Sequence, residues 1–161
     1  MITNAMLDIL SKTEVFKGLS GHDYEQLCEH SELESFEKNE TIIKEGQIND
    51  ALYVVLKGHL EAILPRGLPG QPERRFSAVR LGTMTPGDSF GEYSLIDRRL
   101  ASCSVIAIEP SEVLKITRAD FERTVSASDH VGRIIYRNLV QLLIRRLRAK
   151  DKELDLVLFV G

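Results

Sequence analysis

The chain has 161 residues, of which 43% are hydrophobic and 28% are charged. These values are ordinary for a globular protein and exclude a disordered, collagen-like or wholly coiled-coil chain. A net charge of −3, only 6% aromatic residues and no Trp disfavour a protein that coats duplex nucleic acid or stacks single-stranded bases.

The N-terminal residues 1–31 are expected to form short helices. Met6, Leu7 and Leu10 fit one helical face, and Ser20 is placed to cap a second helix. No basic segment precedes an apolar run, and no apolar run reaches about 18 residues. We therefore expect a cytoplasmic protein that has neither a signal peptide nor a membrane span.

The middle of the chain, residues 32–117, changes to short β-prone runs that are separated by turn residues. The predicted strands are residues 41–44, 51–56, 59–64, 76–81, 102–108 and 113–116. A loop at 65–72 carries three Pro and two Gly. Strands divided by turns at about 8–12 residues predict an antiparallel sandwich or barrel. The fold class is thus mainly β with flanking helices, in a single domain that covers 1–161.

Residues 118–160 return to a helical period. Thr117 caps a short helix, and a long amphipathic helix of roughly 25 residues is predicted within 129–159. Its apolar positions recur every three or four residues, with a gap at Lys150 and Asp151: Ile135, Leu139, Leu143, Leu147, Leu154 and Leu158. The far end is too apolar to be exposed alone, so we predict a homodimer through the 129–159 helix.

The residues that suggest a ligand-binding site lie in the segment Pro-Gly-Asp-Ser-Phe-Gly-Glu at 86–92. Gly91 lets a ligand approach the backbone closely, and a helix that starts there offers free N–H groups to an anion. A carboxylate beside an anion site is unexpected. Glu92 is explained if the anion is a nucleotide phosphate and the carboxylate accepts a hydrogen bond from a ribose hydroxyl. The alternative is that Glu92 only caps the short helix.

Four blocks at 45–46, 52–61, 86–92 and 111–121 resemble, in order and spacing, the cyclic nucleotide-binding domain family of catabolite activator protein and protein kinase A regulatory subunits. The resemblance implies a jelly-roll β-barrel and a phosphate-binding cassette at 90–96. Gly91 would meet the cyclic phosphate and Glu92 the ribose 2′-hydroxyl. The ligand would be cAMP first and cGMP second, with the C-terminal helix as lid and dimer interface.

The cassette departs from the family where an Arg normally pairs with the phosphate. That position is Ala101 or Ser102, and Leu100 replaces the usual Pro. A missing charge-assisted contact weakens binding roughly ten- to hundredfold. Arg98, Arg99 or Ser102 could compensate. The full set of predicted ligand-binding residues is Phe90, Gly91, Glu92, Tyr93, Ser94, Arg98, Arg99, Ala101 and Ser102.

The long helix departs from the family as well. In catabolite activator protein, hydroxyl residues just after the Arg-Arg-Leu run contact the base, and here the matching positions are Lys150 and Asp151. If they reach the pocket, the base preference changes. If they do not, they form a polar gap in the dimer seam.

Two functions remain open at this point. The first is a regulatory module that binds a cyclic nucleotide and signals through its C-terminal helix to an unknown effector. The alternative is a degenerate module that binds no nucleotide and serves dimerisation or interaction. We expect no enzyme activity, cofactor or metal, since the four His are scattered. The chain ends at Gly161, so we expect no DNA binding by this chain alone.

Overall fold

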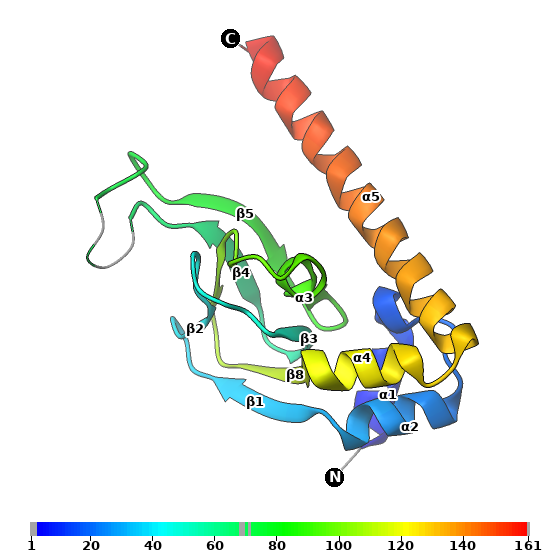
Figure 1. Cartoon of the computed structure of the whole chain (residues 1–161). Coiled ribbons are helices and arrows are strands. Elements are labelled where there is room, and N and C mark those ends of the chain that lie inside the picture. The colour runs from blue at the N-terminus through cyan, green and yellow to red at the C-terminus, as the bar shows by residue number, and fades with distance from the viewer. Residues whose placement is uncertain (1–2, 68–69, 71, 161) are drawn as a thin grey trace.

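Two four-stranded antiparallel sheets and a set of flanking helices make up the protein (Figure 1). The structure, a computed structural model, describes residues 3–67, 70 and 72–160. One sheet has the strand order β1-β8-β3-β6 and the other β2-β7-β4-β5. The strands are β1 (Glu32–Phe36), β2 (Thr41–Ile43), β3 (Ala51–Lys57), β4 (Leu60–Leu64), β5 (Val79–Met84), β6 (Ser89–Phe90), β7 (Ser104–Ala107) and β8 (Ser111–Thr117). The predicted jelly-roll fold with flanking helices is confirmed.

Helices cover one sheet and interrupt the strands once, at the cassette. They are α1 (Asn4–Lys12), the 3-10 helix η1 (Glu14–Phe16), α2 (Gly21–Glu29), α3 (Glu92–Asp97), α4 (Arg118–Ser126) and α5 (Asp129–Val160). In Figure 1, α1, α2, α4 and the start of α5 gather on one side, and the rest of α5 passes α3 and projects beyond the sheets. Within the described residues, no helix combines the length and apolar character needed to cross a membrane.

Strand β3 separates two hydrophobic cores, because successive side chains point to opposite faces of a sheet. Leu52 and Val54 belong to the core between this sheet and the helices. Tyr53 and Val55 belong to the core between the two sheets. Burial on both faces is why residues 51–56 read as a continuous apolar run rather than an alternating one.

Helix α2 begins with a capping box. The Ser20 hydroxyl and backbone N–H both donate to the Asp23 carboxylate, at 2.6 and 2.8 Å, and Ser20 Oγ accepts from the Asp23 N–H. The hydrogen bond from the Ser20 side chain is the main cause that lowers the pKa of Asp23. Because the folded pKa is lowered, this stabilisation is present above the unfolded pKa and is lost as the pH falls through the folded value.

Replacing the cap should therefore have a pH-dependent effect. We expect Ser20→Ala to lower the free energy of unfolding by about 1 kcal/mol at pH 7. The difference should shrink progressively as the pH falls below about 4 towards the lowered pKa of Asp23, because the folded carboxylate then becomes protonated. Urea unfolding at pH 7 and pH 3 measures this, with the exposed loop residue Ser77→Ala as control. An equal difference at both pH values would contradict the assignment.

Strand β5 begins later than predicted. The alternating pattern at 76–81 predicts a strand, but β5 spans Val79–Met84 and pairs Val79 with Leu64 at the end of β4. Phe76 lies before it and is fully exposed. An alternating sequence is not enough to form a strand where no neighbouring strand pairs with its first residues. Part of the predicted loop at 65–72 lies outside the described residues.

Helix α5 is longer than predicted and has two apolar faces instead of one. It is 32 residues long and continues through Lys150 without a break. Ile135, Leu139 and Leu142 are buried against the body of the protein, whereas Leu147 and Leu154 are exposed. The polar pair in the pattern therefore marks no interruption of the helix, because Lys and Asp side chains are compatible with helical backbone.

Candidate functional site

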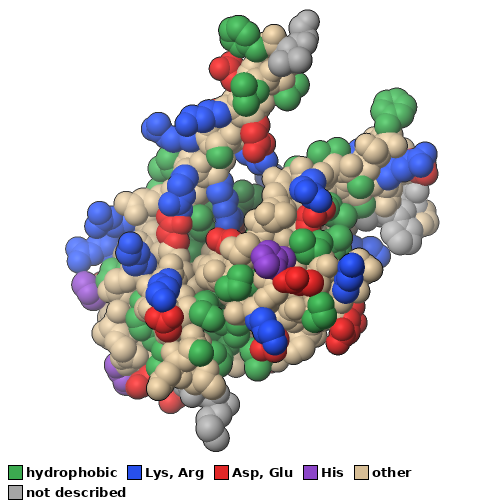
Figure 2. All heavy atoms as spheres, turned by 180° about the vertical axis from the view of Figure 1, so that it is seen from behind, with side chains coloured by type: hydrophobic (Ala, Val, Ile, Leu, Met, Phe, Trp, Pro, Cys, Tyr) green, Lys and Arg blue, Asp and Glu red, His purple; other side chains and the backbone are tan. Residues whose placement is uncertain are grey.

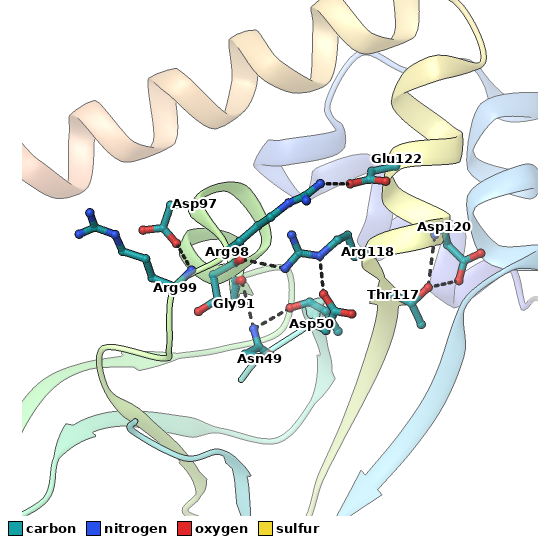
Figure 3. Close-up of polar contacts among 12 residues, drawn as sticks. Asn49, Asp50, Gly91, Asp97, Arg98, Arg99, Thr117, Arg118, Asp120 and Glu122 are labelled. Atoms are coloured by element: carbon teal, nitrogen blue, oxygen red, sulfur yellow. Dashed lines mark hydrogen bonds and ion pairs between the residues drawn. The ribbon is translucent and has the colours of Figure 1, made fainter. Parts of the chain in front are cut away.

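The cassette starts where β6 turns into α3. Tyr53 of β3 pairs with Phe90 of β6, and their rings are stacked with centroids 5.0 Å apart. This contact buries Phe90 and fixes the turn at Gly91, which has a φ of +88°. Asn49 supports the turn from below, because its side-chain amide donates to the carbonyl oxygens of Ala51 at 2.9 Å and Gly91 at 3.2 Å (Figure 3).

No side chain other than glycine fits at position 91. A Cβ there would lie 2.6 Å from the carbonyl oxygen of Ala51, 2.9 Å from Asn49 Nδ2 and 3.3 Å from the Tyr53 ring. The positive φ adds a second restriction, since L-residues rarely adopt it. The backbone of the cassette is therefore held tightly against β3.

Glu92 is the first residue of α3, and its side chain is buried. One carboxylate oxygen, Oε1, pairs with the Arg146 guanidinium of α5. The other, Oε2, is buried and has no hydrogen-bond partner among the described residues. Arg146 also donates to the backbone carbonyl of Ser89 at 2.7 Å. Burial lowers the pKa of Arg146, and nearby Asp88 acts in the opposite direction.

Arg146 is a site residue that the sequence-based prediction missed. A signal was present: the buried positions Ile135, Leu139 and Leu142 continue at helical spacing to Arg146 and then to Lys150. The face of α5 that packs on the body therefore ends in two cations. Only the tertiary fold places the first of them on Glu92, 54 residues away in the sequence.

Lys150 makes a further contact between α5 and the sheets, one helical turn beyond Arg146. Its Nζ donates to the backbone carbonyl of Leu81 in β5 at 2.9 Å and to Glu153 at 2.7 Å. Helix α5 is thus tied both to the cassette, through Arg146, and to β5, through Lys150.

The segment between α3 and β7 holds no cation at position 101. Ala101 is buried and belongs to the core between the sheets. Its backbone is fixed by two hydrogen bonds of 2.8 Å, to the Gln47 carbonyl and from the Gly46 N–H. Ser102, the neighbouring candidate, is exposed. At the position where the resemblance expects an Arg, this chain thus has an alanine that packs in the hydrophobic core.

The two arginines named as possible substitutes point elsewhere (Figure 3). Arg98 ends α3 and pairs with Glu122 of α4, at 3.6 Å. The Arg99 backbone N–H donates to Asp97, and its side chain extends away from Gly91. In this structure neither guanidinium contacts the cassette turn.

The remaining predicted residues of α3 differ in exposure. Tyr93 is about half exposed, whereas Ser94 is buried. The Ser94 carbonyl accepts from Arg118 at 3.1 Å. Arg118 is the first residue of α4 and also pairs with Asp50 of the β2–β3 loop. This arginine, which the sequence did not single out, ties α3 to α4.

A second buried carboxylate, Glu45, lies close to Ala101, because the N–H of the next residue, Gly46, donates to the Ala101 carbonyl. Glu45 is buried and pairs with Arg75 through both of its oxygens, at 3.0 and 3.2 Å. Arg75 also donates to the Pro65 carbonyl at 2.7 Å, and the Glu45 hydrogen bond raises the pKa of Arg75. The ion pair anchors the β4–β5 loop to the end of β2.

Comparisons with known proteins agree with this architecture. The family model "Cyclic nucleotide-binding domain" matches residues 33–128. The chain is 32% identical over 145 residues to the "Cyclic AMP receptor protein" of Thermus thermophilus, covering 90% of this chain and 62% of the relative. It spans less than two thirds of the length of this relative and about a fifth of plant potassium channels that it also matches.

Solved structures show the same fold. The catabolite activator protein of Thermus thermophilus superposes with a TM-score of 0.73 and 30% identity, over 91% of this chain and 63% of that one. The regulatory domain of Toxoplasma gondii protein kinase A, solved with cAMP, gives a TM-score of 0.67 at 23% identity, over 84% of this chain and 48% of that one. With the family model matching more than half of its residues, this chain belongs to the cyclic nucleotide-binding domain family.

Proposed function

We propose that this chain is a regulatory module that binds a cyclic nucleotide at Gly91 and Glu92 and signals through α5. The observation that carries the proposal is the buried Glu92 Oε2, which has no hydrogen-bond partner in the part of the chain that the structure describes. A buried carboxylate oxygen without a donor is costly. A ribose hydroxyl supplies the missing O–H donor beside a glycine turn that the family resemblance assigns to the cyclic phosphate.

The signal would arise at Arg146. Its guanidinium pairs with Glu92 Oε1 and donates a hydrogen bond to the Ser89 carbonyl, and Glu92 Oε2 is buried from solvent. A ligand that reaches Glu92 must therefore shift α5 or share the carboxylate with Arg146. Ligand binding and the position of α5 are then coupled, and the size of the shift is limited by the difference in affinity between the two positions.

The ligand is tested first as cAMP and then as cGMP, in the order that the resemblance and the names of the relatives suggest. Calorimetric titration of the whole chain with each nucleotide measures binding. We expect Glu92→Gln to weaken binding about 10- to 150-fold, the range for a hydrogen bond to a charged group. The exposed Glu29→Gln serves as control and should leave affinity unchanged. No heat at near-millimolar nucleotide with the unaltered chain would contradict the proposal.

The alternative, a dimerisation module, is favoured by one observation on α5. Five exposed apolar residues, which we call the outer stripe, follow a heptad spacing: Val140, Ile144, Leu147, Leu154 and Leu158. Asp151 occupies the position of this repeat between Leu147 and Leu154. Figure 2 shows apolar side chains on the projecting end of the helix. A heptad stripe that the chain itself does not cover fits a second copy of the same helix, and this pairing is compatible with nucleotide binding.

A further inference from the structure

A groove of about 540 Å³ opens between β2 on one sheet and β3 and β8 on the other, with the β2–β3 loop along its rim. Strand β2 has three residues and β8 has seven. A strand as short as β2 leaves part of the inner face of the opposite sheet uncovered. The volume lies within the range of small-molecule sites, roughly 300–1,000 Å³. The groove is therefore large enough for a ligand of its own.

Two cross-strand pairs form the floor of the groove. Tyr53 of β3 lies opposite Lys115 of β8, and Ala51 lies opposite Thr117. Residues that are directly opposite, or two apart on a strand, share one face of a sheet. All four thus face the space between the sheets, where Tyr53 also joins the hydrophobic core.

The β2–β3 loop is a fixed wall of the groove. The Ala101 N–H donates to the Gln47 carbonyl and accepts, through its own carbonyl, from the Gly46 N–H, both at 2.8 Å. Within the loop, the Gln47 N–H donates to the Lys44 carbonyl at 3.1 Å. A ligand that enters the groove does not have to order this wall, which lowers the entropic cost of binding.

Tyr53 gives the groove an unused hydrogen-bonding group. The residue is only 7% exposed, and its hydroxyl makes no hydrogen bond with any residue that the structure describes. Burial raises the pKa of Tyr53, and the nearby Lys115 ammonium acts in the opposite direction. Buried tyrosine hydroxyls usually have a partner, because leaving one unpaired is costly. The Tyr53 hydroxyl is thus available to a polar atom of a ligand.

The charges along the groove favour an anion. Lys115 is held by Glu34 at 2.9 Å and by Glu32 at 3.6 Å, both on β1. Asp50 is held by an arginine of α4. Lys44 also lines the groove, and it has no ion pair with the described part of the chain. Lys44 is therefore the lining cation that can accept a new counter-ion.

We propose that this groove binds a small amphipathic carboxylate. Its carboxylate pairs with Lys44, its apolar body covers Ile43 and Ile48, and a polar atom meets the Tyr53 hydroxyl. Ile48 supports the apolar part of this assignment, since it lines the groove and is 82% exposed. The site is separate from Glu92 and does not depend on nucleotide binding.

An occupant of the groove would also act on the cassette. Tyr53 stacks on Phe90, and Asn49, which lines the groove as well, donates to the Gly91 carbonyl at 3.2 Å (Figure 3). A ligand that contacts Tyr53 or Asn49 therefore shifts the surroundings of the Gly91 turn from behind. The groove is placed to be an effector site for the cassette.

Titration of the nitrogen-15-labelled whole chain with hydroxyphenylpropionate, followed by NMR, tests this inference. The probe carries a carboxylate, an apolar body and a hydroxyl. We expect saturable shifts of the backbone amides in 41–50 and of the Gly91 amide. The neutral amide analogue of the probe should bind about 3- to 10-fold more weakly, because it lacks the charged contact.

Three variants assign the contacts. Lys44→Met should bring the affinity for the acid down to that for the amide analogue. Lys38→Met, at an exposed turn outside the groove, should leave the difference unchanged. Tyr53→Phe keeps the aromatic ring and should remove the preference for hydroxyphenylpropionate over phenylpropionate, about 3- to 10-fold in the unaltered chain.

Several outcomes would overturn the inference. The unaltered chain is sufficient for the first two: no saturable shift in 41–50 at about 10 mM probe, or equal affinity for acid and amide. Shifts in the groove without any at Gly91 would show that the groove does not act on the cassette. Failure of cAMP and cGMP to bind would contradict the proposed function and leave each of these results unchanged.

Discussion

Gly91→Ala should be among the most damaging single substitutions in this chain, lowering the free energy of unfolding by roughly 3–5 kcal/mol. A left-handed backbone costs an L-residue about 1–2 kcal/mol, and the new methyl group would lie 2.6 Å from the Ala51 carbonyl oxygen. That oxygen belongs to β3, which is paired on both sides and cannot easily move. We also expect nucleotide binding to be lost. Urea unfolding and calorimetric titration measure the two effects.

The same motif supplies a matched control. Gly87 has a similar φ of +96°, but a Cβ there would meet nothing within 4 Å. Gly87→Ala should therefore show only the backbone cost of about 1–2 kcal/mol. The difference between the two variants isolates the steric contact of the cassette with β3. Equal losses of stability would show that close approach does not matter at Gly91.

Leu154→Glu should convert a dimer into a monomer if the outer stripe of α5 pairs with a second copy. Leu154 is 58% exposed in the single chain, so the substitution should cost little stability there. In a dimer it would place two carboxylates in an apolar seam, which weakens association at least a hundredfold. Sedimentation velocity over a range of concentrations measures the change.

Two further variants control this experiment. Ala149→Glu adds the same charge at an exposed position off the outer stripe and should leave association intact. Asp151→Leu should strengthen association, because a polar residue in a heptad seam reduces stability. If the unaltered chain stays monomeric at high concentration, the stripe is not covered by a second copy.

Helix α5 connects the cassette that contains Gly91 with the outer stripe that contains Leu154. Near its start α5 is fixed by buried apolar residues, and Asn138 donates to the carbonyl oxygens of Val15 and Lys17 at 3.1 and 2.8 Å. In the middle it meets the cassette through Arg146. From Leu154 to Phe159 its apolar side chains are exposed. A change at Glu92 can therefore reach the outer stripe along one continuous helix.

Local patterns were sufficient to predict much of the molecule. Period-two and period-3.6 hydrophobicity identified the β region and the helices on both sides of it. The glycine and proline turns placed the motif at 86–92 correctly between a strand and a short helix. Ser20 and Thr117 do cap helices, as predicted. These features depend on neighbours in the sequence, so the sequence alone carries the information.

The partners of the charged side chains were decided by the tertiary structure. Arg146 on Glu92, Arg75 on Glu45 and Arg98 on Glu122 join residues that are 24 to 54 positions apart. A long, flexible side chain pairs with whatever carboxylate the fold brings within its reach, and no periodicity encodes that choice. The sequence showed by itself that the cassette lacks its usual arginine at Ala101. The fold brought a cation, Arg146, to Glu92 from a different element. This is possible because the face of α5 that is buried at Leu142 continues onto the cassette.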